Sequence, residues 1–332
     1  MRRTSFRIKN KCAVIWLFFI HCLTCPMLSF AAPILPSMAD LAYGDEPAQR
    51  LDIYKPSGSE PFPVVVFIHG GGWQSGDKKW FMSDPDTQRF LSAGIAVVSI
   101  NYRMLGQAQK DGLFPPVLGP SDDARRALQT IRYHAKEWGL AASDIALSGE
   151  SAGGCTALWL ALSPDMAKPN SSDPVDRMST RVVAVGVRAA QTTLDPLQIH
   201  EWVPETSYGA RAFGMSDASK ADFEAFLQKR PELEKYFATV SPAALLGPYN
   251  PPIYLAYGKS LDDPKKDDNY YIHSPEWGIG FQKLAQEKGA ICLLEYKGKP
   301  AAGNEKHDIF DFLIHYLKRV KGPNPRQNSP RS

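Results

Sequence analysis

The stretch from Ile145 to Leu162 constrains the fold of this chain more than any other feature. The apolar run Ile145–Ser148 is followed by Gly149–Gly154, which reads Gly-Glu-Ser-Ala-Gly-Gly, and then by almost wholly apolar residues as far as Leu162. A buried strand that turns sharply into a buried helix is typical of α/β proteins, in which helices pack against a sheet. We therefore predict a strand, a tight turn and a helix over these residues.

Other short apolar runs, rich in β-branched and aromatic residues, read as further buried strands. They cover residues 51–54, 64–68, 95–100, 182–187, 253–257 and 291–296. Helix-like stretches lie between or after several of them, at residues 122–138, 281–288 and 309–320. Alternation of strands and helices predicts right-handed crossovers and an α/β fold with a mostly parallel, doubly wound sheet that is covered on both faces.

One segment, residues 195–240, interrupts this alternation. It holds no strand-like run but has helix-like stretches at 218–229 and 231–238. Insertions after strands fall at the carboxyl edge of a sheet, where ligands bind, so we expect either a helical cap over a site or a peripheral decoration. Its aromatic residues Trp202, Tyr208 and Phe213 either line an acyl or sugar pocket or simply pack. The predicted domain occupies residues 32–320, and the Pro-rich tail 321–332 is predicted to be disordered.

The first 31 residues resemble a targeting segment. Five basic residues and no acidic ones precede or flank the apolar run Cys12–Ile20, and the small-residue pattern Ser29-Phe30-Ala31 follows. This order predicts a signal peptide cut after Ala31 and export to the periplasm or medium. An uncleaved membrane anchor is the alternative, because the segment approaches the length of a membrane span. No later segment is apolar enough to cross a bilayer.

The charge and the cysteines narrow the class of protein further. The formal net charge is +3, but without the five basic residues of the leader the chain carries 33 basic and 35 acidic residues, so nothing favours a nucleic-acid partner. Beyond the leader only Cys155 and Cys292 remain. Two distant cysteines do not make a disulfide scaffold, and we expect two buried thiols rather than one bridge.

Ser151 is the candidate nucleophile. A serine on a tight strand-to-helix turn presents its hydroxyl above the sheet edge, and glycines flank it because side chains there would meet neighbouring backbone. The first amides of the following helix carry the positive end of the helix dipole toward the same point, which favours a developing oxyanion. The pattern in this context therefore predicts nucleophilic catalysis.

A second motif, residues 69–73, follows the predicted strand 64–68 and reads His-Gly-Gly-Gly-Trp. Three consecutive glycines indicate backbone that must approach a ligand closely. We expect the amides of Gly71, Gly72 and Ala152 to form an oxyanion hole. A phosphate-binding loop is excluded because neither glycine-rich phosphate signature is present, and His69 is expected to pin the loop.

A serine nucleophile needs a general base, and the base needs a group that orients it. Among the seven histidines, His307 lies between the last predicted strand and the last helix, where the chain order nucleophile, acid, base requires the base. His273 is the alternative. His21, His134, His200 and His315 fall in the leader, on helices or in the insertion and carry no such signal.

The acid is expected on the loop that follows the predicted strand 253–257. This loop offers four aspartates, of which only one can serve. Asp263 comes soon after the strand end and is taken first, and Asp268 is second because the loop is long enough to fold back. The remaining candidates are Asp262 and Asp267.

Taken together, these motifs resemble the α/β-hydrolase superfamily. Within it they resemble hormone-sensitive-lipase-like enzymes and the exported carbohydrate esterases that remove feruloyl or acetyl groups from xylan. The matching pieces are Leu51–Tyr54, His69–Trp73, Gly76–Lys78, Asn101–Arg103, Asp122–Ala124, Gly149–Gly154 and His307. The resemblance implies a serine esterase with Ser151 as nucleophile, His307 as base and a preceding aspartate. It departs from the family pattern in the loop Ser260–Tyr271, which lacks the compact Gly-x-x-Asp spacing.

The expected function is therefore hydrolysis of carboxylic esters, small or linked to polysaccharide, through an acyl-serine and without a metal or cofactor. An amidase or peptidase with the same triad is the first rival. A catalytically inactive binding protein that keeps the fold is the second, motivated by the irregular acid loop. Metal hydrolysis is disfavoured because the sequence has no His-Glu-x-x-His or comparable cluster.

Overall fold

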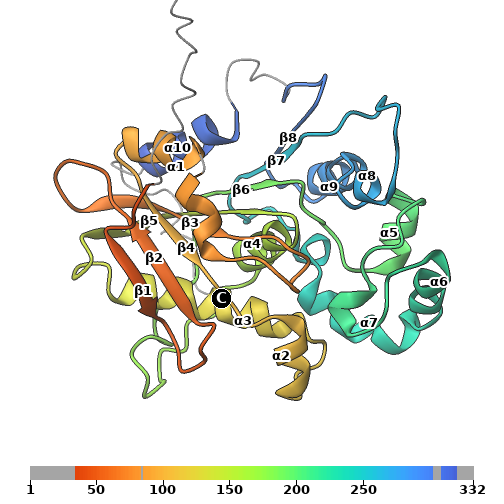
Figure 1. Cartoon of the computed structure of the whole chain (residues 1–332), viewed down its shortest axis with the longest axis horizontal. Coiled ribbons are helices and arrows are strands. Elements are labelled where there is room, and N and C mark those ends of the chain that lie inside the picture. The colour runs from red at the N-terminus through yellow and green to blue at the C-terminus, as the bar shows by residue number, and fades with distance from the viewer. Residues whose placement is uncertain (1–33, 84, 302–307, 320–332) are drawn as a thin grey trace, which may run out of the picture. The chain divides into compact units, whose positions relative to one another are not determined.

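The computed structural model describes residues 34–83, 85–301 and 308–319 (Figure 1). The predicted signal peptide over residues 1–31, the predicted disordered tail over 321–332 and the predicted base His307 lie outside the described residues.

One eight-stranded sheet forms the centre of the described chain, in the order β1-β2-β4-β3-β5-β6-β7-β8. The strands are β1 (Met38–Ala42), β2 (Arg50–Tyr54), β3 (Phe62–Ile68), β4 (Ala96–Ile100), β5 (Leu140–Glu150), β6 (Val185–Arg188), β7 (Ile253–Tyr257) and β8 (Cys292–Tyr296). β1 pairs with β2 and β2 with β4 in the antiparallel sense, and every other neighbouring pair is parallel. Such a mostly parallel sheet needs helices on both faces because its strands are apolar on both sides.

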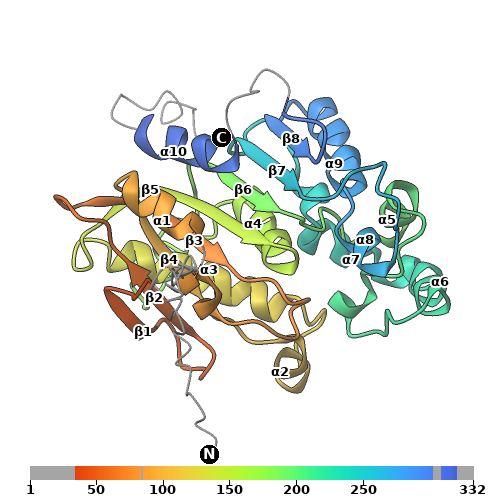
Figure 2. The same ribbon diagram turned by 45° about the horizontal axis from the view of Figure 1, so that its top comes forward.

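The helices supply that cover. The α-helices are α1 (Pro85–Ser92), α2 (Leu105–Lys110), α3 (Leu118–Tyr133), α4 (Ala152–Leu162), α5 (Pro196–Trp202), α6 (Lys220–Gln228), α7 (Arg230–Val240), α8 (Asp268–Ile272), α9 (Glu276–Glu287) and α10 (Ile309–Arg319), and the 3-10 helices are η1 (Lys78–Ser83), η2 (Ala210–Phe213) and η3 (Pro242–Leu245). α1 and α10 form one core with one face of the sheet, and α3, α4 and α9 share the core on the other face (Figure 2).

The predicted α/β fold is confirmed. Each strand-like run of the sequence forms a strand, with ends that shift by a few residues, and α4 has the bounds expected from its apolar run. α3 is amphipathic as predicted: Ala124, Ala127, Leu128 and Ile131 are buried. The helix begins earlier than expected, at Leu118, and ends at Tyr133, so residues 134–138 form turns.

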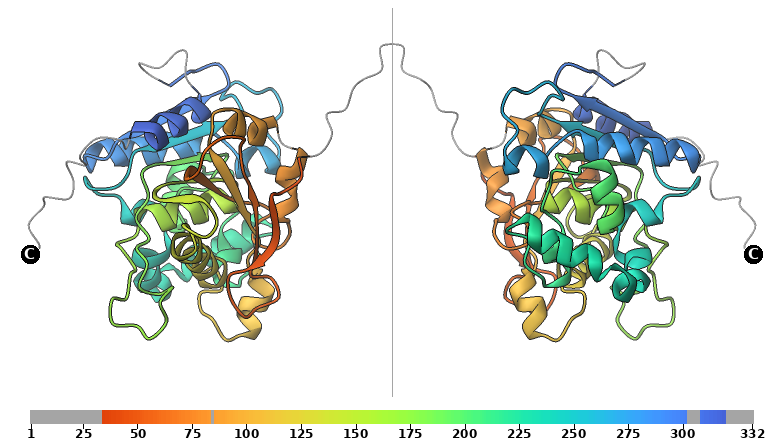
Figure 3. Two further views of the ribbon diagram at one scale, coloured as in Figure 1. Left: turned by 90° about the vertical axis from the view of Figure 1, so that its left-hand side faces the viewer. Right: turned by 90° about the vertical axis from the view of Figure 1, so that its right-hand side faces the viewer.

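The segment 195–240 contains α5, η2, α6 and α7, and no strand is found within it among the described residues. It lies at the end of the sheet remote from β1 and β2, as opposite side views show (Figures 1 and 3). Its helices are held by aromatic packing, with Phe213 against Phe226 and Phe237 at 5.4 and 5.1 Å between ring centroids. We call this segment the cap segment.

The structure also bears on the two cysteines and on membrane-spanning helices. Cys155 and Cys292 are buried free thiols, as predicted, and burial raises the pKa of each. In the part of the chain that the structure describes, no helix is long and apolar enough to cross a membrane.

Candidate active site

Ser151 lies on the sharp turn between β5 and α4. Its backbone has φ 53° and ψ −125°, a left-handed conformation that is strained for a residue with a side chain. The surrounding glycines have no room for a side chain: a Cβ on Gly149 would lie 2.6 Å from the Gly153 carbonyl oxygen, and a Cβ on Gly153 would lie 2.2 Å from that of Ile68. The predicted steric reason for the glycines is therefore confirmed.

His273 is the histidine that the structure places on Ser151. Its Nε2 lies 3.0 Å from the Ser151 Oγ, although the two residues are 122 positions apart. His273 is the residue after α8, and it follows β7 at the carboxyl edge of the sheet. This distance is a hydrogen bond, and it lets the serine hydroxyl donate its proton to the imidazole.

The other ring nitrogen of His273 has oxygen partners. Its Nδ1 lies 3.2 Å from both the backbone oxygen and the side-chain Oδ1 of Asn269, one helical turn earlier. Both partners accept, so Nδ1 carries the proton and Nε2 is left as the acceptor for Ser151. Sequence reasoning missed Asn269, although its spacing of four residues before His273 on one helix is the signal that would have found it.

Burial lowers the pKa of His273 below the usual 6.5, while the hydrogen bond to Asn269 and the negative charge of Glu150 oppose this shift. The imidazole is therefore neutral at pH 7 and can accept a proton. The Glu150 carboxylate lies directly before the nucleophile and favours the imidazolium that forms during proton transfer.

The backbone around His273 is fixed by buried side chains. Gln191, on the loop after β6, donates its amide to the carbonyl of Ile272 at 2.7 Å. The indole of Trp277 in α9 donates to the carbonyl of Tyr271 at 2.9 Å. Both donors are fully or almost fully buried, so α8 and the histidine after it are held in one position.

Asp263, the acid expected from the sequence, does not contact the histidine that faces Ser151. Its carboxylate accepts the Ser260 amide at 2.9 Å and lies 3.6 Å from the Lys297 Nζ. The backbone hydrogen bond from Ser260 is the main cause that lowers the pKa of Asp263. The aspartate closes the turn after β7 and lies near the end of β8, and its predicted role as the acid partner of His307 stays a prediction.

The other aspartates of this loop also have other roles. Asp267 caps α8 by accepting the Tyr270 amide at 3.0 Å. Asp262 and Asp268 are exposed. In the described residues, no carboxylate is hydrogen-bonded to His273. His307 is not among those residues, so its predicted role as base stays a prediction.

The glycine loop Gly70–Gly72 lies beside Ser151. A Cβ on Gly70 would come within 3.3 Å of the Ser151 Cβ, and Gly71 and Gly72 have φ of 97° and 62°, which glycine adopts without strain. The amides of Gly71, Gly72 and Ala152 donate no hydrogen bond to any residue that the structure describes. They are thus free to bind a ligand oxygen, and their predicted role as an oxyanion hole stays a prediction.

Buried side chains hold this loop. His69 is fully buried, its Nδ1 lies 2.8 Å from the Gly70 oxygen and its ring stacks on Tyr102 at 4.3 Å. The Tyr102 hydroxyl donates to the His69 oxygen at 2.8 Å. The Trp73 indole donates to the Thr156 hydroxyl in α4 at 2.9 Å, which ties the loop to the helix of the nucleophile. The expected structural role of His69 is confirmed.

A cavity of about 970 Å³ opens beside the site. Glu150, Asn269 and His273 line it together with residues at the ends of β6, β7 and β8. Its wall mixes charges of both signs, with Arg188 paired to Asp86. The cavity offers space for a polar group next to His273.

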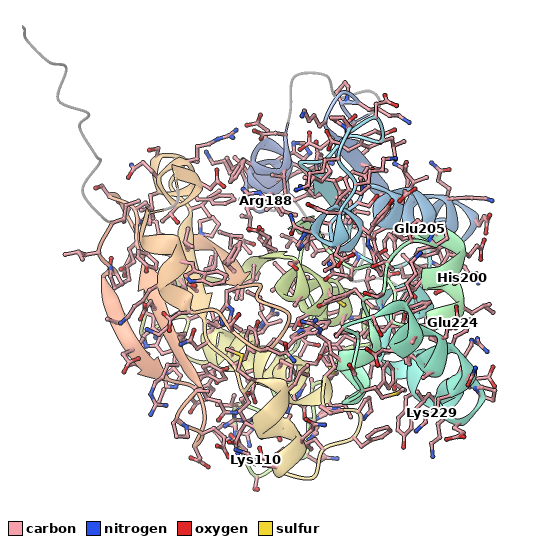
Figure 4. The ribbon with its side chains drawn as sticks, turned by 45° about the vertical axis from the view of Figure 1, so that its right-hand side comes forward. Lys110, Arg188, His200, Glu205, Glu224 and Lys229 are labelled. Atoms are coloured by element: carbon pink, nitrogen blue, oxygen red, sulfur yellow. The ribbon has the colours of Figure 1, made fainter. Side chains whose placement is uncertain are left out.

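The three aromatic candidates of the cap segment lie in different surroundings. Phe213 packs in the aromatic cluster of the cap, and Trp202 packs on Gly280 of α9. Only Tyr208 of the three comes close to the glycine loop, with its hydroxyl 3.7 Å from the position of a Cβ on Gly72. The exposed side chains of His200, Glu205, Glu224 and Lys229 lie along the outer side of this segment (Figure 4).

The described residues contain no group of three or more His, Cys, Asp or Glu side chains arranged to hold a metal ion. The chemistry that this arrangement supports is nucleophilic attack by a serine next to a neutral histidine and a set of free backbone donors.

The chain and its fold are similar to several known proteins. The chain is similar to kynurenine formamidase of Danio rerio, with 30% identity over 126 residues that cover 37% of this chain and 38% of that protein. Its fold is similar to a thermophilic esterase from Thermogutta terrifontis, with a TM-score of 0.59, 22% identity and coverage of 88% of this chain and 95% of that one. It is also similar to an acetyl ester-xyloside bifunctional hydrolase from Caldicellulosiruptor lactoaceticus, with a TM-score of 0.57, 19% identity and coverage of 86% and 95%.

The chain spans only about 22% to 38% of the length of the first curated relatives that it matches. The structural likenesses cover most of both chains and show the α/β-hydrolase fold. The BD-FAE family model matches residues 51–264, which is more than half of the chain and includes the glycine loop and Ser151. The chain therefore belongs to the BD-FAE family of α/β-hydrolase esterases.

Proposed function

We propose that this chain hydrolyses carboxylic esters through an acyl-serine intermediate. The observation that carries the proposal is the 3.0 Å contact between the Ser151 Oγ and the His273 Nε2, on a strained turn beside free amides of the glycine loop. Membership of an esterase family supports the same reaction.

The proposed reaction begins when the Ser151 oxygen attacks the ester carbonyl carbon and its proton passes to the His273 Nε2. The amides of Gly71, Gly72 and Ala152 bind the oxyanion of the tetrahedral intermediate. The imidazolium then gives its proton to the leaving alcohol as the carbon–oxygen bond breaks. Water repeats the two steps on the acyl-serine and releases the acid. This sequence of steps needs neither a metal nor a cofactor.

His273 and His307 are both candidates for the base. Geometry favours His273, and chain order in the superfamily favours His307. We assign the base to His273 because, in the part of the chain that the structure describes, it is the histidine in contact with the nucleophile. Asn269 replaces the usual carboxylate in holding its tautomer, with Glu150 supplying the nearby negative charge.

For the substrate we propose acetyl or feruloyl esters carried by a plant polysaccharide. The family that the chain belongs to contains bifunctional feruloyl and acetyl esterases. The Caldicellulosiruptor lactoaceticus protein of similar fold is named as an acetyl ester-xyloside hydrolase. We further propose that the chain is exported after removal of residues 1–31, which N-terminal sequencing of the secreted protein tests.

A formamidase-like reaction is the second candidate, because the similar Danio rerio protein is named as a formamidase. Turnover of 4-nitrophenyl acetate and of 4-nitroacetanilide separates ester from amide chemistry at one acyl group. We expect the ester to react at least a hundredfold faster, and Ser151→Ala to abolish its turnover while thermal unfolding stays nearly unchanged. Preference for the anilide would overturn the esterase assignment.

A further inference from the structure

Arg211 of the cap segment reaches the glycine loop. A Cβ on Gly72 would lie 2.7 Å from the Arg211 Nη1, and the same nitrogen donates to the Gln74 Oε1 at 3.2 Å. The guanidinium therefore lies against the backbone that carries one of the proposed oxyanion donors. Sequence reasoning gave Arg211 no role.

The position of Arg211 is set by Asp217. The Arg211 Nε and Nη2 donate to the two carboxylate oxygens of Asp217 at 2.7 and 2.8 Å, and only 7% of the Asp217 side chain is exposed. The guanidinium also lies over the Tyr208 ring at 4.7 Å. A bidentate pair stacked on an aromatic ring fixes the orientation of the guanidinium plane.

Two of the five N–H groups of Arg211 remain after these contacts, which use the Nε–H, one Nη2–H and one Nη1–H. The side chain is 24% exposed, so part of it is accessible to a ligand. The charge of Arg211 is compensated by Asp217, so this site favours neutral oxygen acceptors over a net negative group.

The Tyr208 hydroxyl is a second group beside the glycine loop that could bind a ligand. Its side chain is 3% exposed, and its hydroxyl is buried without a hydrogen-bond partner among the described residues. A buried hydroxyl with no partner is costly unless a ligand or water satisfies it. The hydroxyl lies 3.7 Å from the position of a Cβ on Gly72, which is the position that the Arg211 Nη1 also approaches, so both groups lie on the same side of the loop.

We propose that Arg211, Tyr208 and Gln74 form a subsite that hydrogen-bonds the hydroxyl and ring oxygens of a neutral saccharide, which is the alcohol part of the ester. This inference rests on the proposed function and extends it by naming the residues that select the alcohol. Planar amide and guanidinium groups beside an aromatic hydroxyl match the closely spaced oxygens of a sugar.

The first test compares two acetates of cyclic secondary alcohols, the monoacetate of methyl xyloside and cyclohexyl acetate. The readout is the ratio of their kcat/KM values, from the release of acetate. We expect Arg211→Gln and Tyr208→Phe each to lower this ratio about tenfold. Tyr208→Phe removes only an oxygen that has no partner, so it keeps the fold even where loss of Arg211 leaves Asp217 unpaired.

Arg230→Gln is the matched control. Arg230 lies in the same cap segment, is 27% exposed and binds Asp195 in the same bidentate manner at 2.8 Å, but contacts no residue of the glycine loop. The ratio of the two kcat/KM values in Arg230→Gln should equal that of the wild type. An unchanged ratio in both Arg211→Gln and Tyr208→Phe, or an equal fall in Arg230→Gln, would overturn the subsite while leaving esterase activity in place.

The second test does not depend on turnover. Binding of xylotriose to Ser151→Ala is measured by titration calorimetry, and we expect the added Arg211→Gln change to weaken it at least tenfold, unlike Arg230→Gln. If the wild type hydrolyses neither acetate but this difference in binding is found, the proposed function fails and the subsite stands. If Ser151→Ala binds no saccharide, or binds it equally with and without Arg211, the subsite is overturned.

Discussion

At the scale of single residues, the site depends on the protonation of His273. Burial lowers its pKa below 6.5, against the opposing effects of Asn269 and Glu150. Only the neutral imidazole accepts the serine proton. Activity is therefore lost as the pH falls through the pKa of His273 in the folded protein, and it is complete well above that pKa.

The first prediction is therefore a kcat/KM for 4-nitrophenyl acetate that rises with pH, with a midpoint below 6.5, and is level at pH 7 and above. Glu150→Gln removes a negative charge that raises this pKa, so its midpoint should move to lower pH. A wild-type midpoint above 6.5, or a shift to higher pH in Glu150→Gln, would contradict this account of the site.

The second prediction separates the two candidate bases. His273→Gln should reduce kcat about a thousandfold or more, because it removes the acceptor 3.0 Å from Ser151. His307→Gln is the matched variant, with the same change at the histidine that chain order favours, and it should keep most of the activity. The reverse pattern would show that His307 is the base and that the contact with His273 is not catalytic.

Sequence reasoning identified some residues of the site and not others, for a physical reason. Ser151 was identified because its turn requires glycines at fixed spacing, which are visible in the sequence. Asp263 could not be singled out because a polar loop of this length offers several carboxylates, and only the fold shows that Asp263 closes the turn after β7. Asn269 was missed although it lies only four residues before His273, because the five-residue helix between them was not predicted. Arg211 reaches the glycine loop through tertiary structure, so no local pattern marks it.

At the scale of elements, a buried hydrogen bond joins the glycine loop to the helix of the nucleophile. The Trp73 indole donates to the Thr156 hydroxyl, and both side chains are almost fully buried. This contact keeps the two sets of proposed oxyanion donors in register, with Gly71 and Gly72 on one side and Ala152 on the other.

The third prediction follows from this contact. Thr156→Val leaves the Trp73 N–H unpaired and should lower the free energy of unfolding by about 1–3 kcal/mol. It should also lower kcat more than it changes KM, because the donors act mainly on the transition state. Urea denaturation and steady-state kinetics measure the two effects.

Thr180→Val is the control for this change. Thr180 is equally buried, and its hydroxyl accepts the Met166 amide at 3.0 Å in a loop remote from the glycine loop. It should lose similar stability and keep the wild-type kcat. An equal fall of kcat in both variants would show that the Trp73 contact has no specific part in catalysis.

The elements themselves were predictable to different degrees. Strands β3, β4 and β7 are nearly continuous apolar runs, and β5 contains a shorter one, which is the pattern of strands buried on both faces. β1 was missed because it is an edge strand whose residues are only half-buried or exposed, so it has no apolar run. α8 was missed because a helix of five residues shows no periodicity.

At the scale of the whole molecule, a buried ion pair joins the antiparallel edge of the sheet to the segment after the glycine loop. The Lys78 Nζ lies 2.7 Å from the Asp52 Oδ1, and the side chains are 4% and 3% exposed. Asp52 also accepts the Asp40 amide at 2.7 Å, which ties β1 to β2.

The fourth prediction concerns this pair. Lys78→Met leaves the Asp52 charge buried and unpaired, and it should lower the free energy of unfolding by about 3–5 kcal/mol. Lys79→Met is the matched control, because Lys79 is exposed, and it should change stability by less than about 0.5 kcal/mol. Equal midpoints of chemical denaturation for the two variants would show that the pair does not stabilise the fold.

The central claim is that the folded chain is a working serine hydrolase rather than an inactive binding protein of the same fold. Labelling with a fluorophosphonate, followed by intact mass and peptide mapping, tests it most directly, because the reagent needs an activated serine. The prediction is one label per chain, on Ser151, and none in Ser151→Ala. Folded wild-type protein that stays unlabelled would contradict the claim and favour the binding protein.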